Sequence, residues 1–519
     1  MNPSKYSQTR RLFLKRSMAL GAAGMAPLVY QLEAIAAAAA DNGALSHASQ
    51  LKSTLAINDV AAANPGYKAL VCLFMAGGND NANFIIPFDQ ADYNTYAAAR
   101  TTSAIPRTGD PTTPSANNGT NLRGLIPIGP VASQGGRTLA FHPNVGKNGV
   151  TDPAQFRNDG LPWLWDNGKM AVIANVGPLA VPLTKTEYTN KSKARPTNLF
   201  SHSDQVTTWM TSASTGYSST GVGGRIADLV DSMNVPPAGQ PKIATCVSIA
   251  GVNRYQIAEL AQSYQINTSG PVALSQAAFY SYGNYVNINS AINAAFQDQI
   301  TRLRGNHFET QWGGMMNSSL QTRTAINAAL TANALPAQAT FRTTGNSLSS
   351  QLRMVARLIN SGAQLGMQRQ IFYVQIGGFD VHGNEFHPQS NTNWNRISEA
   401  VYDFYQALSA INAQNQVTLF SASDFGRTLD SNGGGTDHGW GGHHFVVGGM
   451  VKGGDVYGTF PTVALNTTTD INRGSLLPTT SVDQYHATLA KWFGVADSDI
   501  PTVIPNIAAF SPGNLGFMN

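Results

Sequence analysis

Continuous apolar runs of strand length recur along the chain. Residues 67–75 (YKALVCLFM) and 169–176 (KMAVIANV) are two such runs, and each is followed closely by glycine. Runs of this kind are typical of strands that are buried on both faces, as in a parallel sheet. Residues 370–376, 417–421 and 444–447 repeat the pattern in the second half of the chain. The sequence therefore predicts a buried, mostly parallel sheet.

Segments with the spacing of an amphipathic helix separate these runs. Residues 348–359, 397–408 and 482–492 carry apolar side chains three or four positions apart, which places them on one helix face. Alternation of helices with buried strands predicts an α/β fold, a three-layer α/β/α arrangement around a mostly parallel central sheet. We expect residues 67–519 to form a single domain, with a helical insertion around 285–335 that is rich in Ala, Gln and Asn.

The first forty residues have the parts of a secretory signal. Paired arginines, Arg10 and Arg11, precede Phe13-Leu14-Lys15, and an apolar run at 18–32 leads to an alanine-rich zone. This order indicates a twin-arginine signal over residues 1–40. The alternative is an N-terminal helix or anchor, but the run is shorter than the ~20 residues that a membrane span needs. We therefore expect export in the folded state to the periplasm or outside the cell, a linker at 41–66, and no membrane span after signal removal.

Composition narrows the range of partners. Charged residues make up 12% of the chain, against about 25% in an average protein. Residues 1–40 hold five basic residues and one acidic residue, so their removal lowers the formal net charge from +4 to 0. We find no basic patch with interleaved aromatic residues, and we expect no nucleic-acid partner. Cys72 lies inside an apolar run and is expected to be buried, although a disulfide with Cys246 after export remains an alternative.

Polar residues follow the carboxyl ends of the predicted strands, which is where functional groups of α/β proteins gather. Asp80 follows the first strand, Asp380 and His382 follow the strand at 370–376, and Asp424 follows the strand at 417–421. The carboxyl ends of parallel strands share one edge of a sheet, so these residues are expected to converge. Aspartate and imidazole together suit Zn²⁺, Mn²⁺ or a similar divalent ion.

A glycine-rich loop adds a second group of candidates. Asp437 and His438 follow three glycines, which allow the backbone to turn tightly around a ligand. His443 and His444 are neighbours at the start of a strand, so at most one of them is expected to face the site. Arg427 either pairs with a carboxylate or holds an anionic substrate through its planar fork.

The segment SHSD at 201–204 offers a nucleophile. Ser201 or Ser203 at a helix N-terminus could attack a phosphoryl or sulfuryl centre. The alternative is structural, because Ser201 followed by Asp204 resembles a helix cap. His202 and His142 are expected only as supporting groups near the ligands.

Several motifs together resemble one family. They are FMAGGNDNANFIIP, SHSDQVTTW, GGFDVHGNE, SASDFGRT, GTDHGWGGHHFVVGG and TTSVDQYHATLAKWFGV, in this order along the chain. The sequence resembles the DUF1501 family of exported bacterial proteins, which is placed in the alkaline phosphatase-like superfamily with phosphatases and sulfatases. The resemblance implies a metal site at the strand ends, with Asp80, a serine, Asp380 with His382, Asp424 and His438 in the superfamily's order. The chain departs from the superfamily pattern where Asp424-Phe425 replaces an Asp-His pair.

These observations lead to two alternatives. The first is an exported metal-dependent hydrolase of phosphate or sulfate esters, with one or two divalent ions (Zn, Mn, Mg or Ca) held by seven aspartates and histidines. They are Asp80, Asp380, His382, Asp424, Asp437, His438 and His443, with Ser203, Ser201 and Arg427 as catalytic candidates. The second is a non-catalytic binding or assembly protein of the same fold that contacts a cell-surface polymer or an exported protein partner.

Overall fold

The computed structural model describes residues 64–108, 124–147, 153–271, 295, 298–300, 302, 306–383 and 386–519. The predicted signal and most of the predicted linker lie outside these residues. The chain separates into two compact units. The larger comprises residues 57–235, 244–268 and 333–519, and it contains every element discussed below except the helix α12 (His307–Ala332). That helix lies within the range expected for the insertion and belongs to the second unit. The expectation of a single domain stays a prediction.

A twisted central sheet forms the middle layer of the larger unit. Within the described residues it has nine strands, in the order β13-β5-β12-β9-β1-β8-β6-β7, with β14 also paired to β5. Only β12 runs antiparallel to its neighbours β5 and β9, and the other described pairings are parallel. The strands are β1 (Lys68–Met75), β5 (Met170–Gly177), β6 (Cys246–Ser248), β7 (Ser263–Gln265), β8 (Arg369–Ile376), β9 (Val417–Ser423), β12 (Gly442–Gly448), β13 (Val456–Tyr457) and β14 (Thr480–Ser481). The five predicted strands and the mostly parallel sheet are thereby confirmed.

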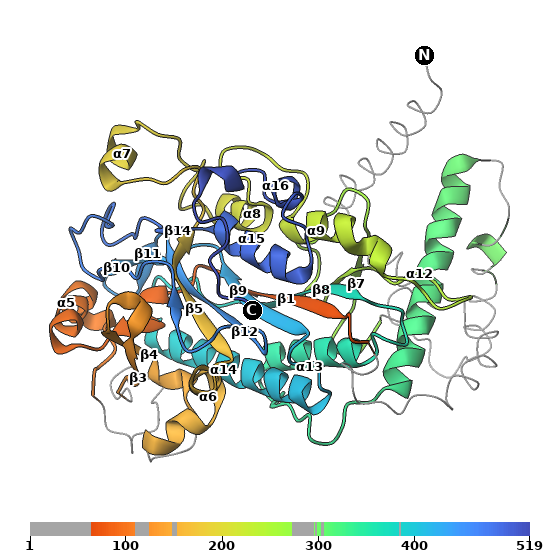
Figure 1. The fold of residues 1–519 in the computed structure, drawn as a ribbon, viewed down its shortest axis with the longest axis horizontal. Coiled ribbons are helices and arrows are strands. Elements are labelled where there is room, and N and C mark those ends of the chain that lie inside the picture. Colours follow the sequence, from red (N-terminus) through yellow and green to blue (C-terminus); the bar gives the residue numbers. More distant parts are fainter. Residues whose placement is uncertain are drawn as a thin grey trace. The chain divides into compact units, whose positions relative to one another are not determined.

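Helices cover both faces of this sheet (Figure 1). One face carries α8 (His202–Thr211), α9 (Val222–Val230), α15 (Val482–Phe493) and α16 (Ile500–Val503), and the other carries α6 (Gly160–Asp166), α13 (Ser347–Asn360) and α14 (Phe386–Ala410). The three-layer α/β/α fold expected from the sequence is confirmed. Two smaller sheets join it, β2-β4-β3 (Ile85–Pro87, Arg137–Phe141, Ile126–Val131) and β10-β11 (Arg427–Ser431, Thr436–His438), with α5 (Gln90–Arg100) and α7 (Lys185–Asn190) at the periphery.

The core follows from the alternation of side chains along β1. Leu70, Cys72 and Phe74 point to the face that carries α8, α9 and α15, and they share one buried cluster with residues of those helices. The intervening residues of β1 are buried as well, so they point to the opposite face. A strand buried on both faces requires the continuous apolar run from which it was predicted.

The helix α15 begins where its sequence dictates. The Ser481 side chain accepts a hydrogen bond from the backbone of the first turn, and the Gln484 side chain accepts one from the Ser481 backbone N–H, which makes a capping box. Gly494 ends the helix in the left-handed region, with φ of 118°.

No helix among the described residues is both long enough and apolar enough to cross a membrane.

The two cysteines are buried and unpaired. Cys72 lies on β1 and Cys246 on β6, with β8 between these strands. Strands are spaced about 4.8 Å apart, so the two Cα atoms are farther apart than the ~7 Å limit for a disulfide. The disulfide left open by the sequence is therefore incompatible with this sheet.

Candidate metal centre

His202 is the first residue of α8 and points back toward the end of β9. Its Nδ1 lies 2.8 Å from Oδ2 of Asp424, the residue that follows β9. The other oxygen, Oδ1, accepts the backbone N–H of Gly77 at 2.8 Å. A buried carboxylate so placed fixes the ring and leaves the lone pair of the imidazole on Nε2. That Nε2 atom is buried and makes no hydrogen bond among the described residues.

His438 ends β11 and is oriented in the same way. Its Nδ1 lies 2.7 Å from the carbonyl oxygen of Phe200. A carbonyl can only accept, so Nδ1 carries the proton and Nε2 carries the lone pair. Burial lowers the pKa of His438, and the nearby Arg427 and His202 lower it further. The imidazole is therefore neutral at pH 7, the form in which it binds a metal.

Asp380 lies between these two imidazoles. Its Oδ2 is 3.4 Å from Nε2 of His202, and its Oδ1 is 3.5 Å from Nε2 of His438. One ligand atom from each of the three residues lies within 4.8 Å of the others. Burial alone would raise the pKa of Asp380, but its hydrogen bond and ion pair with Arg427, together with the nearby His202 and His382, lower the pKa to about 2. The carboxylate is thus ionised at any physiological pH.

His382 adds a third imidazole at the border of this group. Its Nε2 lies 2.9 Å from Oδ1 of Asp380 and 3.2 Å from Nε2 of His438. Its Nδ1 lies 3.5 Å from Oδ1 of Asp437. We use the term metal cluster for His202, Asp380 and His438, and regard His382 as a candidate fourth ligand.

Asp437 is not one of the three residues of the cluster. It forms an ion pair with Arg473 and accepts a hydrogen bond from Asn432 at 3.0 Å. Burial would raise the pKa of Asp437, but these hydrogen bonds and the charge of Arg473 lower it on balance. Asp437 therefore reaches the cluster only through His382.

Arg427 is buried beneath the cluster, and its donors are occupied. Nε donates to the Gly78 carbonyl at 2.9 Å, and Nη1 donates to the Thr436 carbonyl at 2.9 Å. Nη2 donates to Asp380 at 2.6 Å and to the carbonyls of Phe379, at 3.0 Å, and Gly77. Of the two roles open from the sequence, the structure favours pairing with a carboxylate. The residue ties the loops after β1, β8 and β10 together.

Glycine is required where β1 ends. Gly78 has φ of 82°, and a Cβ there would lie 2.3 Å from the ring of Phe425. That ring packs against His202 and His438, at centroid distances of 4.8 Å and 4.5 Å. The close approach of Phe425 to the Gly78 backbone thus supports two of the three cluster residues.

Two of the expected ligands lie apart from the cluster. Asp80 is buried and forms an ion pair with Arg100 of α5, so the carboxylate after β1 is committed to a structural pair. His443 is also buried. Its ring stacks on Phe460 at 4.6 Å, and its Nδ1 accepts the backbone N–H of Asn175 at 3.1 Å. The expectation that both join the site is corrected by this placement.

The two candidate nucleophiles hydrogen-bond next to the cluster rather than into it. Ser201 donates to Asp204 at 2.6 Å, and Oγ of Ser203 lies 3.2 Å from Oγ of Ser201. Ser201 occupies the N-cap position of α8 but makes no capping hydrogen bond. His202, which the sequence assigned a supporting role, is the residue of this segment that enters the cluster.

The donor set fits a single divalent ion. Two imidazoles and one ionised carboxylate are typical ligands of Zn²⁺ or Mn²⁺, whereas Mg²⁺ and Ca²⁺ prefer oxygen ligands. Three protein ligands that leave a position open are the arrangement of catalytic zinc sites. Nε2 of His202 is buried and makes no hydrogen bond within the described part of the chain, and its contact with Oδ2 of Asp380 at 3.4 Å is longer than an ordinary hydrogen bond. An ion between these two atoms would give both of them a partner.

Fold and cluster together define an α/β protein with a candidate metal centre at the carboxyl edge of its sheet. A family model described as "Protein of unknown function (DUF1501)" matches residues 67–505. The chain therefore belongs to the DUF1501 family, as the resemblance indicated. No curated protein matches the sequence.

Two solved structures are similar to this chain at low sequence identity. One is Ps i-CgsB in complex with k-i-k-neocarrahexaose, with 8% identity, a TM-score of 0.30, and coverage of 85% of this chain and 77% of that one. The other is a mutant of the alkaline phosphatase PafA, with 11% identity, a TM-score of 0.20, and coverage of 70% of this chain and 64% of that one. At these scores the two likenesses carry no argument about the function.

Proposed function

We propose that the protein binds one divalent ion, Zn²⁺ or Mn²⁺, through His202, Asp380 and His438, and uses it to hydrolyse a phosphate or sulfate ester. The observation that carries the proposal is the shared orientation of the two imidazoles. Each has its Nδ1 against an oxygen acceptor and its Nε2 toward Asp380. This arrangement supports a prearranged site, because the orienting acceptors hold the lone pairs in place before any ligand arrives.

When bound, the ion would supply a Lewis acid that polarises the ester and lowers the pKa of a water molecule. The residues of the chain would do the rest. Asp424 and the Phe200 carbonyl would keep the protons of His202 and His438 on Nδ1. Arg427 would hold Asp380 in place and ionised. We assign nucleophilic attack to water rather than to Ser203, because Ser203 is hydrogen-bonded to Ser201 beside the cluster.

His382 is the group best placed for proton transfer. Its Nε2 lies at the cluster, and its Nδ1 is near the carboxylate of Asp437. An imidazole between a reacting centre and a carboxylate can accept a proton and be stabilised in the charged form. We propose that it acts as a general base or as a fourth ligand, and the pH dependence of activity would separate these roles.

The test combines metal analysis with activity. Purified full-length protein should contain about one Zn²⁺ or Mn²⁺ per chain and should hydrolyse 4-nitrophenyl phosphate or 4-nitrophenyl sulfate. Asp380→Asn should lose both properties. Asp430→Asn is the matched control, since Asp430 also pairs with an arginine, Arg473. Metal-free protein that stays inactive with every added divalent ion would contradict the proposal.

A second candidate is a non-catalytic protein that binds a metal and a polymer or protein partner. The observation that favours it is the occupation of the polar groups around the cluster. Arg427 is saturated by backbone carbonyls and Asp380, and Ser201 donates to Asp204. Bound metal without hydrolysis of either ester would support this candidate. Under both alternatives we propose export by the twin-arginine route.

A further inference from the structure

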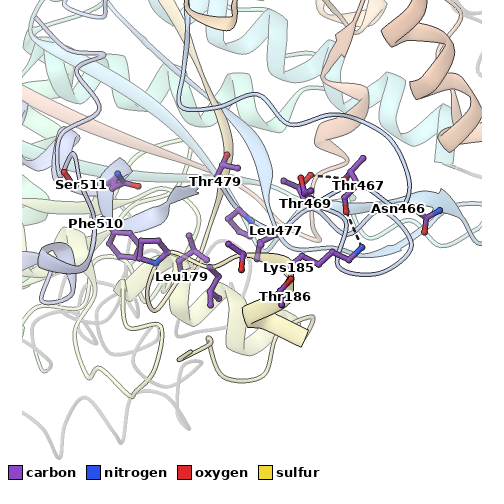
Figure 2. A pocket seen from close by; sticks show the side chains of 16 residues that line it. Leu179, Lys185, Thr186, Asn466, Thr467, Thr469, Leu477, Thr479, Phe510 and Ser511 are labelled. Carbon is purple, nitrogen blue, oxygen red and sulfur yellow. Dashed lines mark hydrogen bonds between the residues drawn. The ribbon is translucent and has the colours of Figure 1, made fainter. Parts of the chain in front are cut away.

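A separate pocket lies beyond the end of β5, with a volume of about 750 Å³ (Figure 2). It is lined by segments from 179–186, 466–469 and 477–479, and by Phe510. None of the residues of the metal cluster lines it. Its volume is within the range of about 300–1,000 Å³ that is usual for small-molecule sites.

The floor of the pocket is apolar. Leu179, Leu477 and Phe510 line it and belong to a buried hydrophobic cluster that also contains Trp440. Trp440 is anchored by a hydrogen bond from its indole N–H to the carbonyl of Pro178 at 2.9 Å. A fixed apolar floor accommodates C–H groups of a ligand without rearrangement.

The walls carry many hydroxyl groups. Six threonines line the pocket, at positions 184, 186, 467, 468, 469 and 479. A threonine hydroxyl both donates and accepts, so a group of them matches a ligand with many hydroxyls of its own. The hydroxyl of Thr479 donates to the Thr459 carbonyl at 2.9 Å, which leaves its lone pairs to accept.

The charge of the pocket is positive. Lys185 is the one charged residue among those that line it, and no carboxylate does. Its ammonium donates to the Thr467 carbonyl at 3.2 Å, an interaction visible in Figure 2. An ammonium has three N–H groups, so two remain for a ligand. A cationic ligand is disfavoured here, whereas an anionic group would find a partner.

We propose that this pocket binds a sugar unit that bears one anionic group, such as a uronate. Lys185 pairs with the anionic group, the threonines hydrogen-bond the ring hydroxyls, and the C–H face of the sugar rests on Leu179, Leu477 and Phe510. The site does not depend on the metal cluster, and binding there does not require catalysis. A free sugar acid and a unit within a polymer share this chemistry.

The experiment measures binding by calorimetry to the full-length protein after treatment with a chelator. The probes are glucuronate, a short oligosaccharide that contains glucuronate, and glucose. We expect glucuronate to bind more tightly than glucose. We expect Lys185→Gln to weaken glucuronate binding at least about tenfold, the size of the loss of a charged hydrogen bond. Tighter binding of the oligosaccharide than of the free acid would identify a polymer as the source.

Lys191→Gln is the matched control, because Lys191 is an exposed lysine of the same segment that does not line the pocket. It should bind glucuronate as the unaltered protein does. The proposal is overturned if glucuronate does not bind, if glucose binds equally well, or if both lysine variants behave alike. Because the metal has been removed, such a failure leaves the proposed hydrolase function untouched, and loss of ester hydrolysis leaves the pocket proposal untouched.

Discussion

This protein has two groups of histidines, and they differ in what surrounds them. His202 and His438 are partly exposed, and each has its Nδ1 against an oxygen acceptor. His443, His444 and His486 are fully buried, and burial lowers the pKa of each to about 3. Both groups contain members of one glycine-rich stretch of sequence. Proximity in sequence therefore does not decide which histidines can bind a metal; access and orientation do.

The buried group has a structural role. His444 lies 4.6 Å from the ring of Trp209 on α8, and its Nδ1 lies 3.2 Å from the hydroxyl of Ser421. Nδ1 of His486 lies 3.0 Å from the hydroxyl of Ser212, the C-cap of α8. The helix that presents His202 to the metal cluster thus rests on buried histidines at its other end.

The largest effect is expected at the centre of the exposed group. Asp380→Asn removes the charge with little change in shape, and it should weaken metal binding by ~100-fold or more, since even the partners that orient ligands contribute 10- to 100-fold. A competition titration with a chromophoric chelator measures the affinity. An affinity equal to that of Asp430→Asn would show that the ion binds elsewhere.

The next effect concerns orientation. Asp424→Asn leaves all three ligands in place but alters the partner of His202 Nδ1, so metal affinity should fall by about 10- to 100-fold. The competition titration with a chromophoric chelator measures this affinity as well. Unchanged affinity would mean that the contact between Asp424 and His202 does not prepare the site, and the comparison with the buried histidines would lose its main support.

The third prediction tests the packing beneath the exposed group. Gly78→Ala should destabilise the protein by ~1–3 kcal/mol, because the new Cβ meets Phe425 and the residue keeps a left-handed φ. Gly135→Ala is the control, since Gly135 has φ of 70° and no atom within 4 Å of an added Cβ. Urea denaturation should show a smaller decrease in the free energy of unfolding for Gly135→Ala than for Gly78→Ala. Equal decreases would indicate that the left-handed backbone conformation, and not the contact with Phe425, accounts for the destabilisation.

The fourth prediction concerns the buried group and pH. The folded pKa values of His443, His444 and His486 are depressed, so the unfolded state binds more protons as the pH falls below about 6.5. Their contribution to stability is present above that pH and is lost progressively toward pH 3. Asp483 has the opposite effect on the pH dependence of stability, because burial raises its pKa to about 6. It is a single group, so the effect of the three histidines is larger. The urea midpoint should therefore decrease between pH 7 and pH 5, and a constant or rising midpoint would contradict this.

The smallest effect is expected for the serine. Ser203→Ala should change ester hydrolysis by less than about tenfold if water is the nucleophile, since loss of a true nucleophile typically costs orders of magnitude more. Steady-state kinetics on the two nitrophenyl esters measures it. A loss comparable to that of Asp380→Asn would return Ser203 to the role expected from the sequence.

The fold was predictable from sequence because its signals are local. The run at 67–75 is apolar throughout, and a strand buried on both faces requires such a run. The site was predictable only in part. Asp380, His382 and Asp424 follow strands of the central sheet, and His438 lies in the segment that leads into β12, so topology brings them to one edge of the sheet.

The errors arose where long-range partners decide the role of a residue. Asp80 follows β1 as a ligand would, but it pairs with Arg100 of α5. The sequence around His202 indicates only a helix cap, because Ser201 and Asp204 flank it. Its partner in the structure, Asp424, is far away in sequence. Only the assembled structure reveals such pairings.

The most direct test of the central claim is anomalous diffraction from crystals of the full-length protein soaked in Zn²⁺ or Mn²⁺. The account predicts one anomalous peak per chain, within bonding distance of Nε2 of His202, Nε2 of His438 and a carboxylate oxygen of Asp380. A peak at the buried histidines, at another site alone, or no peak at all would contradict it.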